Sequence, residues 1–280
     1  MNTNILNLNY YLILNYINKD FYWCLAIPYF EYSGKQIFYQ IKDNNSQKTL
    51  IFIHGSGGNS NIWDNQFYLN IDYNIIALDL PSHNKSNIFP VLSLDLYVDV
   101  VKKFADYLKP ERLILGGHSL GGAVIQEYYF KYSNDVSALI LCATGGRLRV
   151  SQFIYNSIKP KYQEYLNYLR IGSFYRKTSK KVIDNAILET SQIDPEVTYN
   201  DFKICDAFNA LEKTSSINIP CLIICGKADE LTPVKYSQYF HDKIKNSKLV
   251  IVKKAGHMVM IEKPSEVNKA IEDFIKTYFK

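Results

Sequence analysis

The sequence predicts an α/β fold: a mostly parallel central sheet flanked by helices, with a helical cap inserted between two of its strands. Three observations predict this class. Short apolar runs typical of buried strands alternate with longer helical segments, which is the pattern of a parallel sheet covered on both faces. The alternation stops over residues 146–215, where helical segments follow one another. With 280 residues, 47% of them hydrophobic and 21% charged, the chain has the length and composition of one large globular domain.

The strands and helices of the core can be justified in chain order. Residues 37–41 alternate between apolar and polar side chains and are expected to form an edge strand. Apolar runs expected to be strands buried on both faces occur at residues 49–53, 74–78, 112–115, 138–142, 221–225 and 248–252. Helices are expected between them at residues 94–108, 122–132, 234–245 and 264–278. We therefore divide the chain into a core, residues 28–145 and 216–280, and a helical cap insertion, residues 146–215.

Residues 1–27 are assigned to an N-terminal extension whose structure the sequence leaves open. Its apolar stretch is interrupted by Asn15, follows no basic segment and precedes no small-residue cleavage site, which argues against a signal peptide. The stretch is also too short to span a membrane, so no stable membrane insertion is expected. An amphipathic helix packed on the body and a start placed too early are both compatible with it.

The five cysteines include no C-x-x-C pair, and Cys142, Cys221 and Cys225 lie on predicted buried strands. We expect them to be small hydrophobic core residues. Unpaired core cysteines are typical of a reducing compartment, which predicts a cytoplasmic protein.

The charges exclude some classes of partner. The formal net charge of +5 is too mild for a nucleic-acid-binding protein, and no basic block with interleaved aromatics occurs. In the cap, residues 147–181 contain nine basic side chains and one acid, and the balance reverses over residues 184–212. An anionic substrate is one interpretation of the basic half, and a solvated surface is the one we favour. No metal-ligand cluster or nucleotide-binding glycine loop is found, so no metal and no cofactor are expected.

A serine lies on a glycine-rich turn directly after the predicted strand at 112–115. Gly117-His118-Ser119-Leu120-Gly121 fits the G-x-S-x-G elbow, in which a strained turn between strand and helix presents a nucleophilic hydroxyl. The flanking glycines are needed because such a turn leaves no room for side chains. Ser119 is therefore the candidate nucleophile, and His118 is expected to pack or hydrogen-bond locally.

A second glycine-rich loop, His54 to Gly58, follows the predicted strand at 49–53. Its backbone N–H groups can point at an oxygen that becomes negative in a transition state. The N–H of Ser56 is the preferred donor and that of Gly57 the second choice, and a plain tight turn is the alternative interpretation.

An acid and a histidine follow the last two predicted strands. Asp229 is the candidate to orient a histidine, with Glu230 as its adjacent competitor, and His257 follows a glycine turn. Because ligands bind at the carboxyl ends of strands in open α/β sheets, we expect these side chains to meet Ser119 there. Glu262, five residues after His257, is expected to be a structural or helix-entry acid.

Five ordered motifs resemble the α/β-hydrolase superfamily, in particular its capped serine esterase, lipase-like and haloperoxidase-like branch: His54 to Gly58, Asp79 to Ser86, the elbow, Gly226 to Pro233, and Gly256 to Asn268. They extend from about residue 28 to the C-terminus, excluding the cap. One departs from the family pattern D-L-P-G-H-G-x-S, since Ser82 and Asn84 replace two glycines. Asparagine tolerates a positive φ better than serine does, so Ser82 is the more surprising replacement.

The resemblance and the residues imply the same roles. Ser119 attacks a carbonyl carbon, His257 takes and returns its proton, and Asp229 orients the imidazole. The backbone N–H groups of Ser56 and Leu120 form the oxyanion hole.

The predicted function is hydrolysis of a small-molecule carboxylic ester through an acyl-enzyme on Ser119. Thioesterase, lactonase and C–C bond hydrolase are alternatives within the fold, and a non-catalytic ligand-binding receptor is the alternative from another class. The many Tyr and Phe of the cap fit an apolar or aromatic acyl group, although holding the cap together is the explanation we favour. The oligomeric state stays open.

Overall fold

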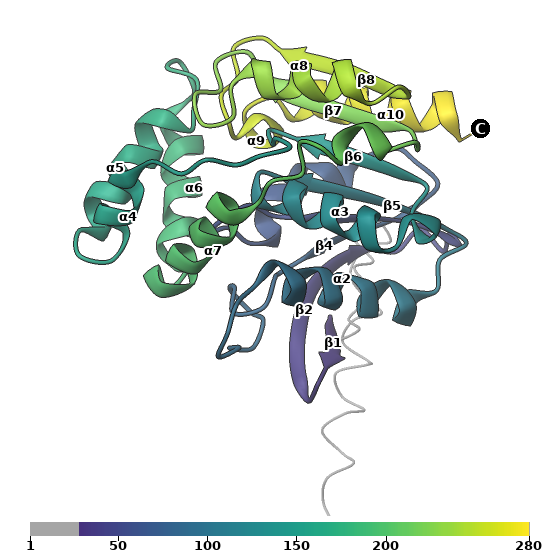
Figure 1. Cartoon of the computed structure of the whole chain (residues 1–280), viewed down its shortest axis with the longest axis horizontal. Helices are drawn as coiled ribbons and strands as arrows, with labels where there is room; N and C mark the ends of the chain where they lie inside the picture. The colour runs from purple at the N-terminus through teal and green to yellow at the C-terminus, as the bar shows by residue number, and fades with distance from the viewer. Residues whose placement is uncertain (1–27, 280) are drawn as a thin grey trace, which may run out of the picture.

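A computed structural model describes residues 28–279 and places a single eight-stranded sheet between two layers of helices (Figure 1). The strand order is β1-β2-β4-β3-β5-β6-β7-β8, in which β1 and β2 are antiparallel to their neighbours and all the others are parallel. The strands are β1 Tyr29–Tyr32, β2 Lys35–Lys42, β3 Lys48–Ile53, β4 Asn74–Leu78, β5 Arg112–His118, β6 Ala138–Cys142, β7 Cys221–Gly226 and β8 Ser247–Val252. The predicted α/β class is confirmed, and the predicted N-terminal extension lies outside the described residues.

The helices cover both faces of the sheet because side chains alternate along each strand. On β3, Ile51 and Ile53 face one core cluster, while Leu50 and Phe52 face the other. The first cluster is closed by α2 Leu94–Leu108, α3 Leu120–Lys131 and α8 Val234–Lys243. The second is closed by the 3-10 helix η2 Ser60–Tyr68, α9 Val259–Glu262 and α10 Pro264–Tyr278. None of the helices in the described part of the chain is long and apolar enough to cross a membrane.

Two predictions about the sheet edges were wrong. The strand predicted at 37–41 is β2, and it is internal because β1 pairs with its outer side through a turn in which Ser33 and Gly34 both have positive φ. The strand predicted at 248–252 is β8, and it forms the opposite edge, with most of its side chains partly or fully exposed. Strands predicted as buried on both faces can therefore be edge strands with an apolar sequence.

Four helices lie between β6 and β7 and stand together beside the sheet, at the left of Figure 1: α4 Gln152–Ile158, α5 Tyr162–Gly172, α6 Lys180–Ser191 and α7 Pro195–Ala207. They share a small apolar cluster that includes Ile158 and Tyr165, and we call these helices and their links the cap. Two short 3-10 helices, η3 Ser133–Asp135 and η4 Thr214–Ser216, complete the elements. Residues 146 and 215 stay our predicted limits of the cap.

The segregated charges of the cap pair with each other. Lys159 of the basic half contacts Glu196, and Arg170 contacts Asp184. Lys180 lies 2.5 Å from the same Asp184 carboxylate. Part of the basic half is thus matched by the acidic half, and these ion pairs give no support to an anionic substrate.

Candidate active site

The nucleophile elbow joins β5 to α3 at Ser119. This residue has φ 52° and ψ −114°, a conformation that non-glycine residues rarely adopt and that is a known store of strain at functional sites. A Cβ at Gly117 would lie 2.3 Å from the carbonyl oxygen of Gly121, and a Cβ at Gly121 would lie 2.3 Å from that of Ile53. Only glycine fits at either position, as the sequence motif requires.

The sheet register places the two glycine-rich loops side by side. Ile53 of β3 lies opposite Gly117 of β5, so the chain leaves the sheet at His54 next to the elbow. The loops carrying Asp229 and His257 also touch, since a Cβ at Gly226 would lie 2.1 Å from the carbonyl oxygen of Gly256.

His257 and Asp229 form the contact expected of a base and its orienting acid. The Nδ1 of His257 lies 2.9 Å from the Oδ2 of Asp229, and both residues are buried. Asp229 also accepts hydrogen bonds from the backbone N–H groups of Leu231 and Thr232 and from the Thr232 hydroxyl. Burial alone would raise the pKa of Asp229, but the charge and hydrogen bond of His257 and the Thr232 donors lower it below its ordinary value. Since Nδ1 donates to the carboxylate, Nε2 is left as the proton acceptor.

Glu230, the sequence competitor, is exposed and forms no hydrogen bond or ion pair with His257. Of these two acids, it is Asp229 whose side chain reaches the imidazole, and its role as the orienting acid stays a prediction. Thr232 was not singled out from the sequence. Its hydroxyl lies 2.8 Å from Asp229 Oδ2 and 3.2 Å from His257 Nδ1, and its position three residues after the acid was the only available signal.

The hydroxyl of Ser119 and the imidazole of His257 line the same cavity. Within residues 28–279, the Ser119 Oγ forms no hydrogen bond to His257. Such catalytic contacts are often long before substrate binds and tighten in the complex, so this geometry is compatible with a serine–histidine pair.

His118 has a local role, as expected. Its Nε2 lies 3.2 Å from the carbonyl oxygen of His257 and must donate to it, and its ring packs 4.6 Å from the His257 ring. Burial and the neighbouring His257 hold the pKa of His118 well below its usual range. The neutral His118 ring therefore holds His257 through one hydrogen bond to its backbone and one ring contact.

Glu262 has a structural role, also as expected. Its carboxylate accepts the backbone N–H of Gly256 at 2.7 Å and that of Tyr175 at 2.8 Å, and it binds the Thr178 hydroxyl. It thereby ties the turn before His257 to the link between α5 and α6 of the cap.

The loop from His54 to Gly58, which we call the candidate oxyanion loop, is held in place by the His54 side chain. The backbone N–H of Leu80 donates to His54 Nε2, so Nδ1 carries the proton and donates to the Gly55 carbonyl at 2.8 Å. Burial and the neighbouring His83 lower the pKa of His54 to about 3, which keeps it neutral. The Gly55 carbonyl also accepts the N–H of Gly58, which closes the turn.

The two preferred oxyanion donors are free. Among the described residues, neither the Ser56 N–H nor the Leu120 N–H donates to a protein acceptor, whereas the Gly57 N–H donates to Asp201 Oδ2 at 2.8 Å. Since Gly57 is already engaged, Ser56 is the better candidate of the two loop residues.

The loop that departs from the family pattern takes the backbone shape that glycines would allow. Ser82 has φ 69° and Asn84 has φ 46°, so both replacements adopt the left-handed region. The Ser82 hydroxyl accepts the N–H of Phe89, and the Asn84 amide donates to Asp79. These hydrogen bonds explain how the loop is kept without the glycines, including at Ser82, where the sequence makes it least expected.

The cavity has a volume of about 610 Å³ and a lining of mixed chemistry. Its apolar lining comes mainly from the cap and the segment after His257, and includes Leu148, Val150, Ile154, Tyr165, Leu169, Phe174, Phe202, Met258 and Ile261. Its polar lining includes amides and carboxylates: Asn59, Asn61, Asp64, Asn65, Asn185, Glu189 and Glu230. Of the lysines and arginines in the described chain, only Arg149 reaches this cavity. Residues 28–279 contain no cluster of three or more His, Cys, Asp or Glu side chains that could hold a metal ion.

Comparison with known proteins agrees with this geometry. A model of the alpha/beta hydrolase family matches residues 50–270. The chain belongs to the α/β-hydrolase family. A solved thermophilic esterase is 31% identical to it, with a TM-score of 0.80, over 90% of this chain and 97% of that one.

Two curated relatives give the same result at lower identity. A bifunctional esterase/perhydrolase of Acinetobacter calcoaceticus is 24% identical over 87% of this chain and 97% of its own length. A monoacylglycerol lipase of Homo sapiens is 23% identical over 92% of this chain and 86% of its own length. The predicted superfamily is confirmed, and this α/β-hydrolase is an enzyme of the hydrolase class with esterase and lipase-like relatives.

Proposed function

We propose that this α/β-hydrolase is a serine carboxylesterase that works through an acyl-enzyme on Ser119. The observation that carries the proposal is the buried contact between His257 Nδ1 and Asp229, which leaves His257 Nε2 as a base in the cavity that Ser119 lines. The esterase and lipase names of the relatives support an ester as the substrate class.

The reaction follows from these positions in two halves. His257 Nε2 takes the Ser119 proton as Oγ attacks the ester carbonyl, and the imidazolium then protonates the leaving alcohol. In the second half His257 Nε2 takes a proton from water as the water oxygen attacks the acyl carbonyl; the imidazolium then returns that proton to Ser119 Oγ as the C–Oγ bond breaks and the acid is released. Asp229 stabilises the imidazolium in both halves.

The developing oxyanion would be bound by the N–H groups of Ser56 and Leu120. General base catalysis is worth about 10² to 10⁴ in rate, and one oxyanion donor about 10² to 10³. Loss of Ser119 or His257 should therefore abolish turnover, while displacement of the Ser56 loop should reduce it in part.

The chemistry of the cavity lining suggests the substrate's character. The apolar lining suits a hydrocarbon or aromatic acyl chain, and burial of that chain would supply roughly 25 cal/mol per Å² of apolar surface. The lining holds three carboxylates and one arginine, so we infer that the substrate carries no negative charge. We also place the protein in the cytoplasm, which the buried free cysteines of the described chain support.

Turnover of p-nitrophenyl acetate and butyrate by the wild type and by Ser119→Ala tests the proposal. We expect hydrolysis by the wild type only, and labelling of Ser119 by a fluorophosphonate. Absence of both turnover and labelling would favour the non-catalytic receptor. Faster turnover of a matched thioester or lactone than of every ester would move the assignment to those alternatives.

A further inference from the structure

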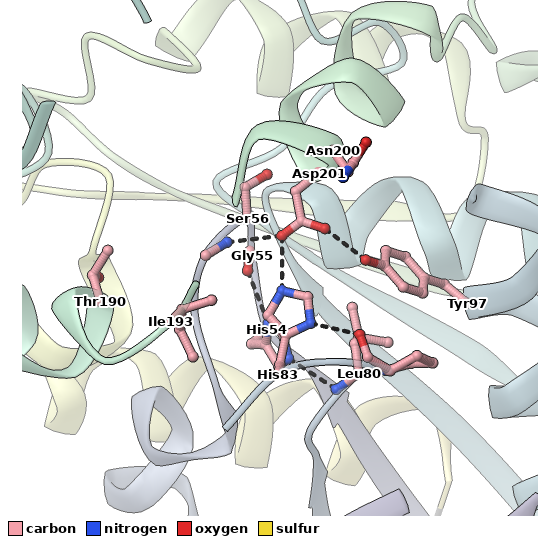
Figure 2. Close-up of polar contacts among 12 residues, drawn as sticks. His54, Gly55, Ser56, Leu80, His83, Tyr97, Thr190, Ile193, Asn200 and Asp201 are labelled. Atoms are coloured by element: carbon pink, nitrogen blue, oxygen red, sulfur yellow. Dashed lines mark hydrogen bonds and ion pairs between the residues drawn. The ribbon is translucent and has the colours of Figure 1, made fainter. Parts of the chain in front are cut away.

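A buried carboxylate from the cap holds the oxyanion loop. Asp201, in the middle of α7, is fully buried, and its Oδ2 accepts the Gly57 N–H at 2.8 Å. The same oxygen lies 2.9 Å from His83 Nε2, and Oδ1 accepts the Tyr97 hydroxyl at 2.7 Å. Figure 2 shows Asp201 pointing down from the cap into this group, with His83 below it and Tyr97 beside it.

The charge of this carboxylate is matched within the core. His83 has both ring nitrogens facing acceptors, the Pro81 carbonyl at 3.0 Å and the Asp201 carboxylate, an arrangement that favours the doubly protonated ring. Burial alone would lower the pKa of His83, but the charge and hydrogen bond of Asp201 and the Pro81 carbonyl raise it above its ordinary value. Separating the two groups of such a buried pair would leave an uncompensated charge in the core, so the pair resists changes in its geometry.

One face of α7 packs on the oxyanion loop. Thr198, Asp201 and Cys205 lie at i, i+3 and i+7 of the helix, which places them on the same side. A Cβ on Gly57, which has φ +60°, would lie 2.8 Å from the Thr198 Oγ1. The Cys205 Sγ lies 3.3 Å from the Ser56 hydroxyl. The loop is therefore enclosed by α7 above and by His54 below.

We propose that Asp201 is a positioning residue for ester hydrolysis: by holding the Gly57 N–H, it orients the adjacent Ser56 N–H toward the oxyanion and couples cap docking to assembly of the oxyanion hole. This inference rests on the proposed function. It assigns to a cap residue a role that neither the sequence motifs nor the triad geometry requires.

Two substitutions at Asp201 and one matched control separate positioning from plain stability. Asp201→Ala removes the acceptor of the Gly57 N–H. We expect kcat for p-nitrophenyl butyrate, calculated per site titrated with a fluorophosphonate, to fall about 10- to 100-fold. A displaced oxyanion donor loses much of its contribution of roughly 10² to 10³ to the rate. KM should change less than about 3-fold, since uniform substrate binding is not affected. Asp201→Asn keeps an oxygen that can face Gly57 and should restore kcat to within about 5-fold of the wild type.

Tyr97→Phe is the control because it removes a hydrogen bond from Oδ1, on the side of the carboxylate away from the loop. It should lower thermal stability, because a buried hydrogen bond to the carboxylate is lost, but leave kcat within about 2-fold of the wild type. A trifluoromethyl ketone, which forms an oxyanion on Ser119, should bind Asp201→Ala more weakly in proportion to its loss of kcat/KM. Unchanged kcat and ketone affinity in folded Asp201→Ala would overturn the proposal.

Amide hydrogen exchange supplies a readout that needs no substrate. In the wild type the Gly57 amide, which donates to Asp201, should be protected, and its exchange should rise at least about 10-fold in Asp201→Ala but stay near the wild-type rate in Tyr97→Phe. If the wild type proves inactive on all esters, the proposed function fails, and unchanged exchange would separately refute the positioning. If Asp201→Ala does not fold, Gly57→Ala displaces the same loop through its clash with Thr198 and must lower kcat with the same small change in KM.

Discussion

Replacement of Asp229 by asparagine changes which groups donate and accept hydrogen bonds next to His257, with almost no change in side-chain volume. One carboxylate oxygen, Oδ1, accepts the backbone N–H groups of Leu231 and Thr232 at 2.9 and 2.8 Å. These are obligate donors, so the oxygen of an asparagine must occupy this position. The amide nitrogen is then forced into the place of Oδ2, where it faces His257 Nδ1.

The amide can only donate at that place, so His257 must accept at Nδ1 and carry its proton on Nε2. An imidazole protonated on Nε2 cannot take the proton of Ser119. The change therefore reverses the tautomer that catalysis needs, and a loss of about 10⁴ in kcat is the size known for such a reversal. The backbone donors stay satisfied, so the fold should be retained.

The assay is steady-state hydrolysis of p-nitrophenyl butyrate, with circular dichroism to establish folding. Glu230→Gln is the matched control, since it makes the same chemical change at the adjacent exposed acid, and its kcat should stay within about 2-fold of the wild type. A folded Asp229→Asn with kcat within about 10-fold of the wild type would show that the His257 tautomer does not depend on Asp229.

Three further predictions concern stability and specificity. Because the pKa of Asp229 is lowered in the folded state, its contribution to stability is present above the ordinary pKa of 3.8 and is lost as pH falls through the lower folded value. The wild type should therefore have a higher denaturant midpoint than Asp229→Asn at pH 6, and this difference should shrink as pH falls below about 3.8. A difference that does not change with pH would contradict this prediction. Gly121→Ala should destabilise the fold by about 3 kcal/mol or make the protein insoluble, because the new Cβ would lie 2.3 Å from a backbone oxygen. An unchanged melting temperature would show that the elbow is packed less tightly than described. Glu189 lines the cavity, accepts hydrogen bonds from the amides of Asn59 and Asn61, and should disfavour anionic substrates. Glu189→Gln should therefore raise kcat/KM for a carboxylate-bearing ester about 3- to 10-fold relative to kcat/KM for its neutral methyl ester. An unchanged ratio would show that Glu189 does not determine specificity.

The elbow and the parallel core could be predicted because their causes are local. The steric demand on Gly117 and Gly121 comes from a five-residue turn, and the buried strands are visible as apolar runs. The short strand β1 was missed because its four residues form a strand only by pairing with β2. The exposure of β8 was missed because an apolar sequence does not show that a strand has a neighbour on one side only.

The candidate site was predictable only in part. The structure brings Ser119 and His257 to one cavity and Asp229 into contact with His257, and their chemical roles stay predictions that the experiments above test. The choice of Asp229 over Glu230 needed side-chain direction, which adjacency in the chain does not give. Asp201 gave no signal at all, because its partners lie 104, 118 and 144 residues away and meet it only when the cap docks.

The proposed function depends on acylation of Ser119. Rapid quenching of the wild type during turnover of p-nitrophenyl butyrate, followed by intact mass and peptide mapping, detects this intermediate. We expect a transient addition of one butyryl group on the peptide containing Ser119, absent in Ser119→Ala and formed much more slowly in Asp229→Asn. Turnover with no acyl adduct, or with the adduct on another residue such as Ser56, would contradict it.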